Sequence, residues 1–171
     1  MLPKSYLIAK WSVYTLATLF LAACQHLILN HISVLGVTAF LYPLLPALVS
    51  SYEGLERGSK FSLVAGVICD ILFYAPFDGF YAITFTIIGI FSAQIGKNLL
   101  SPDGWLCGLT VSSLAMVLVN AFRLAIYFLS GKLEPILMGQ IALVETVITL
   151  PVLLIALPLY RWIHRHCAAD Y

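Results

Sequence analysis

Charge is scarce in this chain, and the scarcity excludes most classes of soluble protein. Only 10% of the 171 residues are charged and 61% are hydrophobic, whereas a soluble domain carries about a quarter charged residues. A mean hydropathy of +0.98 indicates an integral membrane protein. The formal net charge is +1, which provides no basic face, so we expect no nucleic-acid partner.

The sequence also lacks the short motifs that carry common enzyme chemistry. It contains no H-E-x-x-H, no G-x-S-x-G and no P-loop, which mark zinc proteases, serine hydrolases and nucleotide-binding proteins. The four cysteines are isolated, with no C-x-x-C pair that would indicate metal or redox chemistry. We therefore expect a protein that is not an enzyme, with no catalytic residue, no metal site and no cofactor.

What the chain does contain is a series of apolar segments separated by short polar turns. The series predicts an all-α integral membrane protein, a single bundle of six transmembrane helices in one domain, residues 1–171. Pro43 and Pro46 predict a kinked or partial second helix, and Pro151 and Pro158 predict a bend in the sixth. The charged stretch Ser51 to Lys60 predicts a solvated loop. The six predicted helices are Trp11–Leu29, Val34–Ser50, Phe61–Phe77, Phe80–Gly96, Gly104–Ser130 and Ile136–Ile163.

Positive charge is divided unevenly between the two ends of these helices. With six spans both termini share one face, which carries seven Lys and Arg residues, whereas the other face carries only Lys132. Because Lys and Arg are enriched in cytoplasmic segments, we predict that both termini are cytoplasmic. The seven residues are Lys4, Lys10, Arg57, Lys60, Lys97, Arg161 and Arg165.

Three ionisable residues fall inside the predicted spans: Asp70, Arg123 and Glu145. Counted along their helices, all three lie roughly 10–14 Å below the outer surface. Their common depth predicts that Arg123 pairs with Glu145 or Asp70, with Asn120 one turn from Arg123 and Gln140 nearby. This buried polar cluster is either a structural network that locks three helices together or a site for a ligand or proton.

Small residues form a stripe along the predicted fifth helix. Gly104, Gly108 and Ser112 recur at four-residue intervals and therefore share one helical face. Such a stripe lets two helix backbones approach closely. It is a candidate docking face for a single-span partner helix, and internal packing within the bundle is the alternative.

Around Asp70 the residues form a recognisable pattern. Gly66 precedes Asp70 by four residues, Pro76 and Gly79 follow in a short turn, and Ala82 stands at the start of the next apolar segment. This pattern, together with the proline-bearing stretch LYPLLPALV before it, resembles the signature of the MreD family of bacterial rod shape-determining proteins. Chain length and the expected six spans also agree with that family.

The resemblance implies a non-catalytic scaffold in the bacterial cytoplasmic (inner) membrane. Its partners would be membrane lipids, an MreC-like protein, the MreB filament, and the wall-synthesising RodA and penicillin-binding proteins of the cell-elongation machinery. The resemblance also implies an architecture similar to the substrate-binding components of vitamin transporters. A substrate-capture component of such a transporter is therefore the alternative function, and a polar cluster near the outer face is compatible with it.

Overall fold

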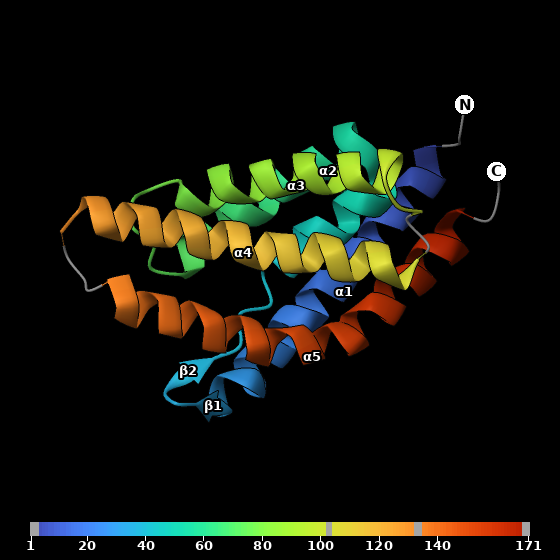
Figure 1. The fold of residues 1–171 in the computed structure, drawn as a ribbon. Helices are drawn as coiled ribbons and strands as arrows, with labels where there is room; N and C mark the ends of the chain where they lie inside the picture. The colour runs from blue at the N-terminus through green and yellow to red at the C-terminus, as the bar shows by residue number, and fades with distance from the viewer. Residues whose placement is uncertain (1–3, 102–103, 132–134, 169–171) are drawn as a thin grey trace.

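A computed structural model describes residues 4–101, 104–131 and 135–168 and confirms the all-α class (Figure 1). Besides the helices, the described residues contain one short antiparallel hairpin, β1–β2, which pairs Ser33 with Thr38 and Val34 with Val37. The elements are α1 (Lys4–Leu27), the 3-10 helix η1 (Leu29–His31), β1 (Ser33–Val34), β2 (Val37–Thr38), α2 (Leu44–Leu72), α3 (Phe80–Asn98), α4 (Trp105–Leu129) and α5 (Pro135–Ala168).

Four helical stretches are long and apolar enough to cross a membrane: Lys10–His31, Phe80–Asn98, Trp105–Leu129 and Ile136–Arg165. They correspond to four of the six predicted spans. Of the other two, most of the predicted third span falls in α2, whereas only residues 44–50 of the predicted second span do. Large apolar side chains also face outward, and Leu16 is 72% exposed. Several serines, in contrast, are fully buried. This distribution is unfavourable in water and favourable in lipid, so the predicted membrane class is supported.

α2 doubles back on itself at Gly54, where the backbone adopts φ 77° and ψ −176°. Glycine adopts this positive φ without the steric cost that a side chain would impose. The bend brings the Ser50 and Ser62 hydroxyl oxygens within 3.0 Å of each other, and a Cβ atom on Gly58 would lie 2.5 Å from the Ser50 Cα. We call residues 44–53 and 55–72 the first and second arms of α2. The prediction of a solvated loop from Ser51 to Lys60 is wrong, because helix continues on both sides of a one-residue bend.

The predicted second helix, Val34–Ser50, is wrong over its first half. Residues 33–38 form the hairpin and residues 39–43 are not helical, although all five are buried. Three side-chain hydrogen bonds satisfy their backbone groups. Gln25 Nε2 donates to the Ala39 carbonyl at 2.9 Å, and the Leu41 amide donates to Gln25 Oε1 at 2.7 Å. The Phe40 amide donates to Thr149 Oγ1 at 3.0 Å. Irregular backbone is tolerated at membrane depth only where protein groups satisfy it in this way.

Replacing Gln25 with leucine is expected to destabilise the protein by roughly 2–4 kcal/mol, because a buried carbonyl and a buried amide each lose their partner. Thermal unfolding of the purified chain in mild detergent measures the loss. The matched control is Gln140→Leu, since Gln140 is exposed on α5. Equal melting temperatures for the two variants would show that the bonds of Gln25 contribute nothing to stability.

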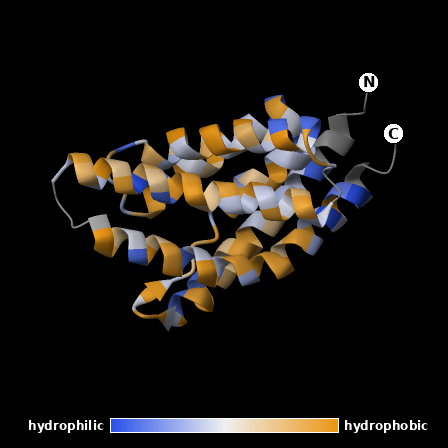
Figure 2. Cartoon of the chain, in the orientation of Figure 1, coloured by the Kyte–Doolittle hydropathy of each residue, from blue (hydrophilic) through white to orange (hydrophobic). Residues whose placement is uncertain are grey.

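One end of the bundle holds a buried ion pair between Lys10 and Glu53, and we call this end the Glu53 end. Lys10 Nζ lies 2.8 Å from Glu53 Oε1, Tyr14 donates to the same oxygen at 2.9 Å, and His164 Nδ1 lies 3.6 Å away. The cluster ties the start of α1 to the bend of α2 and the end of α5, and Figure 2 shows hydrophilic residues gathered there.

Candidate functional site

Asp70 caps the start of α3 from the neighbouring arm of α2. Its two carboxylate oxygens accept hydrogen bonds from the backbone amides of Tyr81, at 2.8 Å, and Ala82, at 2.9 Å. The first amides of a helix have no partner within that helix, and a negative charge there also complements the helix dipole. The expectation that Asp70 belongs to the cluster around Arg123 is therefore wrong, because both of its oxygens are directed at α3.

Gly66 makes this cap possible because it allows α2 and α3 to touch. A Cβ atom at Gly66 would lie 2.5 Å from both the Cα of Ala82 and the carbonyl oxygen of Tyr81. Gly79, at the N-cap of α3, has φ 87° and turns the chain into the helix. Pro76 lies in the connection between the two helices. The family-like motif thus builds a close joint between the second arm of α2 and α3, which we call the α2–α3 joint.

We expect Gly66→Ala to cost roughly 1–3 kcal/mol, because the added methyl group meets backbone atoms that cannot rotate away. The matched control is Gly139→Ala in α5, where an added Cβ meets nothing within 4 Å. In a helix interior Gly139→Ala should be neutral or slightly stabilising. Melting temperatures in the same detergent compare the two, and an unchanged value for Gly66→Ala would show that the joint can open without cost.

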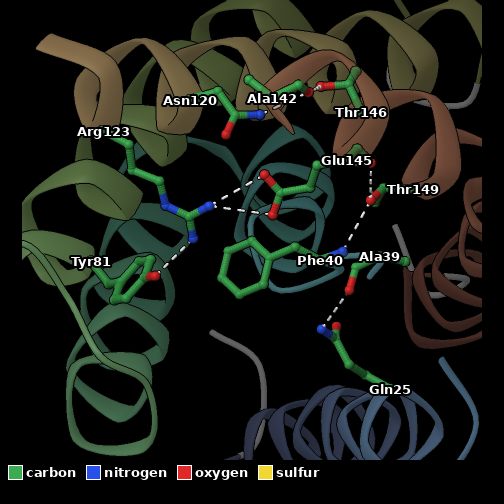
Figure 3. Close-up of polar contacts among 10 residues, drawn as sticks. All are labelled: Gln25, Ala39, Phe40, Tyr81, Asn120, Arg123, Ala142, Glu145, Thr146 and Thr149. Carbon is green, nitrogen blue, oxygen red and sulfur yellow. Dashed lines mark hydrogen bonds and ion pairs between the residues drawn. The ribbon is translucent and has the colours of Figure 1, made fainter. Parts of the chain in front are cut away.

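A buried ion pair joins α4 to α5 (Figure 3). Arg123 Nη1 lies 3.3 Å from each carboxylate oxygen of Glu145, and Glu145 is 7% exposed. Arg123 Nη2 donates to the Tyr81 hydroxyl at 2.8 Å, and the guanidinium carbon lies 4.7 Å from the centre of the Phe40 ring. Of the two predicted acidic partners of Arg123, the structure places Glu145 beside it.

The remaining polar groups of this region extend the contact between α4 and α5. Asn120 Nδ2 lies 3.5 Å from Thr146 Oγ1, at the limit of a hydrogen bond. Asn120, Arg123, Glu145 and Tyr81 all line a cavity of about 220 Å³, which we call the Arg123 pocket. Its volume is below the roughly 300–1,000 Å³ of typical ligand pockets. The structure thus brings Asn120, Arg123 and Glu145 together, whereas Asp70 caps α3 and Gln140 is exposed on α5.

The prediction of a docking face at Gly104, Gly108 and Ser112 is wrong. A Cβ atom on Gly108 would overlap the side chain of Leu157 in α5. Ser112 is completely buried, and Gly104 is the N-cap of α4. Gly108 therefore packs against α5 and Ser112 is buried within the bundle, so this face is not available to a partner helix.

Four residues that help to build these sites were not predicted from the sequence: Gln25, Phe40, Tyr81 and Thr149. Gln25 had a usable signal, because a lone glutamine within an apolar span needs a hydrogen-bonding partner there. Tyr81 and Phe40 are aromatic residues within apolar sequence, and nothing in the sequence marked them as parts of a site. The Thr149 hydroxyl donates to the Glu145 carbonyl of its own helix at 2.6 Å, as a threonine in any helix can. Its position in the sequence therefore did not indicate that it also accepts a hydrogen bond from Phe40.

Within the described ranges, no three His, Cys, Asp or Glu side chains are placed to hold a metal ion together. Comparison with protein-family models, curated proteins and solved structures found no match for this chain. The resemblance of residues 66–82 to the MreD signature therefore stays a prediction.

Proposed function

We propose that this chain is a multi-pass protein of the bacterial cytoplasmic membrane that acts as a non-catalytic scaffold in the cell-elongation machinery. In this role it binds an MreC-like protein and organises RodA, penicillin-binding proteins and the MreB filament around the bundle. The observation that supports a scaffold best is how the bundle uses its ionisable groups. Asp70 is bound by the amides of α3, and Arg123 is bound by Glu145 and Tyr81. Groups used in this way hold helices in fixed positions, as a scaffold requires.

We further propose that the chain crosses the membrane six times, with both termini cytoplasmic. Residues 39–53 would supply the second crossing. Residues 39–41 precede a turn at residues 42–43 and the ten helical residues of the first arm, and together they reach roughly 28 Å, close to the thickness of the hydrocarbon core. The uneven distribution of Lys and Arg supports the orientation. Reporter fusions should place Asn30, Asp78 and Lys132 outside, and Gly58, Ser101 and the C-terminus inside. An external C-terminus would contradict this topology.

The substrate-capture alternative is supported by one observation, the Arg123 pocket with its charged and amide lining. Against it stand the small volume and the contacts that already occupy Arg123. Two phenotypes separate the functions. Depletion of a scaffold should make rod-shaped cells round, and the chain purified from mild detergent should carry the MreC-like protein with it. Depletion of a capture component should instead create a requirement for a soluble nutrient, and the purified chain should bind that nutrient without partners.

A further inference from the structure

A groove between α1 and the second arm of α2 has no role in the scaffold described above. Its volume is about 490 Å³, within the roughly 300–1,000 Å³ range of ligand pockets. Trp11 and Phe61 stack at 6.1 Å between ring centres where the two helices approach, and Leu19 and Ile68 lie at the far end of the lining. Glu56, Arg57 and Lys60 line the opposite end. Thr15 and Thr18 also line the groove, but each hydroxyl donates to a backbone carbonyl of its own helix. The groove is therefore mainly apolar along its length and charged at its mouth.

We propose that this groove binds an anionic phospholipid, with one acyl chain between the helices and the phosphate at Arg57 and Lys60. The length of the groove fits one acyl chain. From Trp11 to Leu19 the lining advances eight residues along α1, and from Arg57 to Ile68 eleven residues along α2, which is roughly 12–17 Å. Half of the hydrocarbon core is about 15 Å thick. The groove thus matches the depth of one leaflet, whereas a transmembrane partner helix would need a groove about twice as long.

The charge at the mouth of the groove favours an anionic headgroup. Lys60 Nζ forms an ion pair with Glu56 Oε1 at 2.9 Å, so Arg57 gives the mouth of the groove one net positive charge. The mouth also lies close in sequence to the bend at Gly54. This bend is at the Glu53 end, to which the predicted topology assigns the cytoplasmic Lys and Arg residues. Basic residues at that level attract anionic headgroups. A zwitterionic phospholipid would fill the same groove without this attraction.

Trp11 provides a direct reporter, since its ring lies in the groove. Trp105 and Trp162, both partly exposed, are replaced by phenylalanine so that Trp11 alone fluoresces. The protein is placed in nanodiscs of unlabelled phosphatidylcholine containing a small fraction of phosphatidylglycerol or phosphatidylcholine with brominated acyl chains. We expect phosphatidylglycerol to quench Trp11 with about fivefold higher apparent affinity, the preference that one basic residue confers near a membrane surface.

Three variants test the assignment. Arg57→Gln combined with Lys60→Gln should abolish the preference between the two lipids. Lys97→Gln, which removes an exposed charge from α3, should preserve it. Val64→Phe, which narrows the groove at a partly exposed position, should weaken quenching by both lipids.

Equal quenching by the two lipids in the parent protein would overturn the proposal. A preference that survives the Arg57 and Lys60 changes, or one that is lost equally with Lys97→Gln, would also overturn it. Native mass spectrometry of the unaltered chain gives a second readout that needs no substitution. There, retained phosphatidylglycerol should outnumber retained phosphatidylcholine, and equal retention would contradict the assignment.

Discussion

Replacing Glu145 with leucine is expected to destabilise the folded protein by roughly 3–5 kcal/mol, the cost of leaving a buried charge without its partner. Glu145 is 7% exposed, and it faces Arg123 Nη1 at 3.3 Å through both oxygens. An arginine cannot lose its proton in a protein, so the guanidinium stays charged when the carboxylate is removed. Thermal unfolding and the monodisperse yield after size-exclusion chromatography in mild detergent measure the loss.

Replacing the other partner, Arg123→Leu, should reduce stability less than Glu145→Leu, because Glu145 can bind a proton and become neutral. The double variant Arg123→Leu with Glu145→Leu should recover most of the stability lost by Glu145→Leu alone, since apolar replacement of both partners of a buried pair is often neutral. Arg57→Leu serves as the control for loss of an arginine outside the pocket. Additive losses in the double variant would contradict a direct pairing of the two side chains.

Loss of the Asp70 carboxylate is the second change with a large expected effect. Asp70→Ala removes two hydrogen bonds from a charged acceptor to the first turn of α3, at 2.8 and 2.9 Å. Each such bond contributes roughly 1.5–3 kcal/mol, so we expect a total loss of about 3 kcal/mol or more. Asp70→Asn keeps one acceptor oxygen and should lose about half as much, because its amide nitrogen cannot accept a bond.

A local readout separates this cap from a general loss of stability. In Asp70→Ala the amides of Tyr81 and Ala82 should exchange with solvent hydrogen faster than in the parent, while those in the middle of α4 change less. Asp78→Ala is the matched control, because Asp78 is exposed at the same end of the bundle. Unchanged exchange at the start of α3 would show that the carboxylate is not needed there.

Helices α3 and α4 could be predicted from sequence because each is a long and mostly apolar run between polar turns. The expected Phe80–Gly96 is observed as Phe80–Asn98, and Gly104–Ser130 as Trp105–Leu129. The second span could not be predicted in the same way. Its backbone partners, Gln25 and Thr149, lie on α1 and α5, and nothing near Phe40 in the sequence indicates that they are close. Hydrophobicity alone therefore favoured a helix where tertiary contacts support an irregular segment.

The candidate site could be predicted only in part, because depth along a helix says nothing about direction around it. Asp70, Arg123 and Glu145 have similar expected depths, but Asp70 faces the start of α3 while Arg123 and Glu145 face each other between α4 and α5. For the small-residue stripe, too, the sequence could not show which helix it faces. Gly108 correctly indicated a close helix contact, yet the sequence could not show that Leu157 of the same chain would fill it.

The central claim is that the buried charges hold the helices in place and perform no chemistry or ligand binding. The double variant Arg123→Leu with Glu145→Leu, produced in cells depleted of the native protein, tests it most directly. If the pair is structural, a double variant present in the membrane at the normal level should restore rod shape. Round cells containing normal amounts of the folded double variant would contradict the claim and show that the Arg123 pocket has a function of its own.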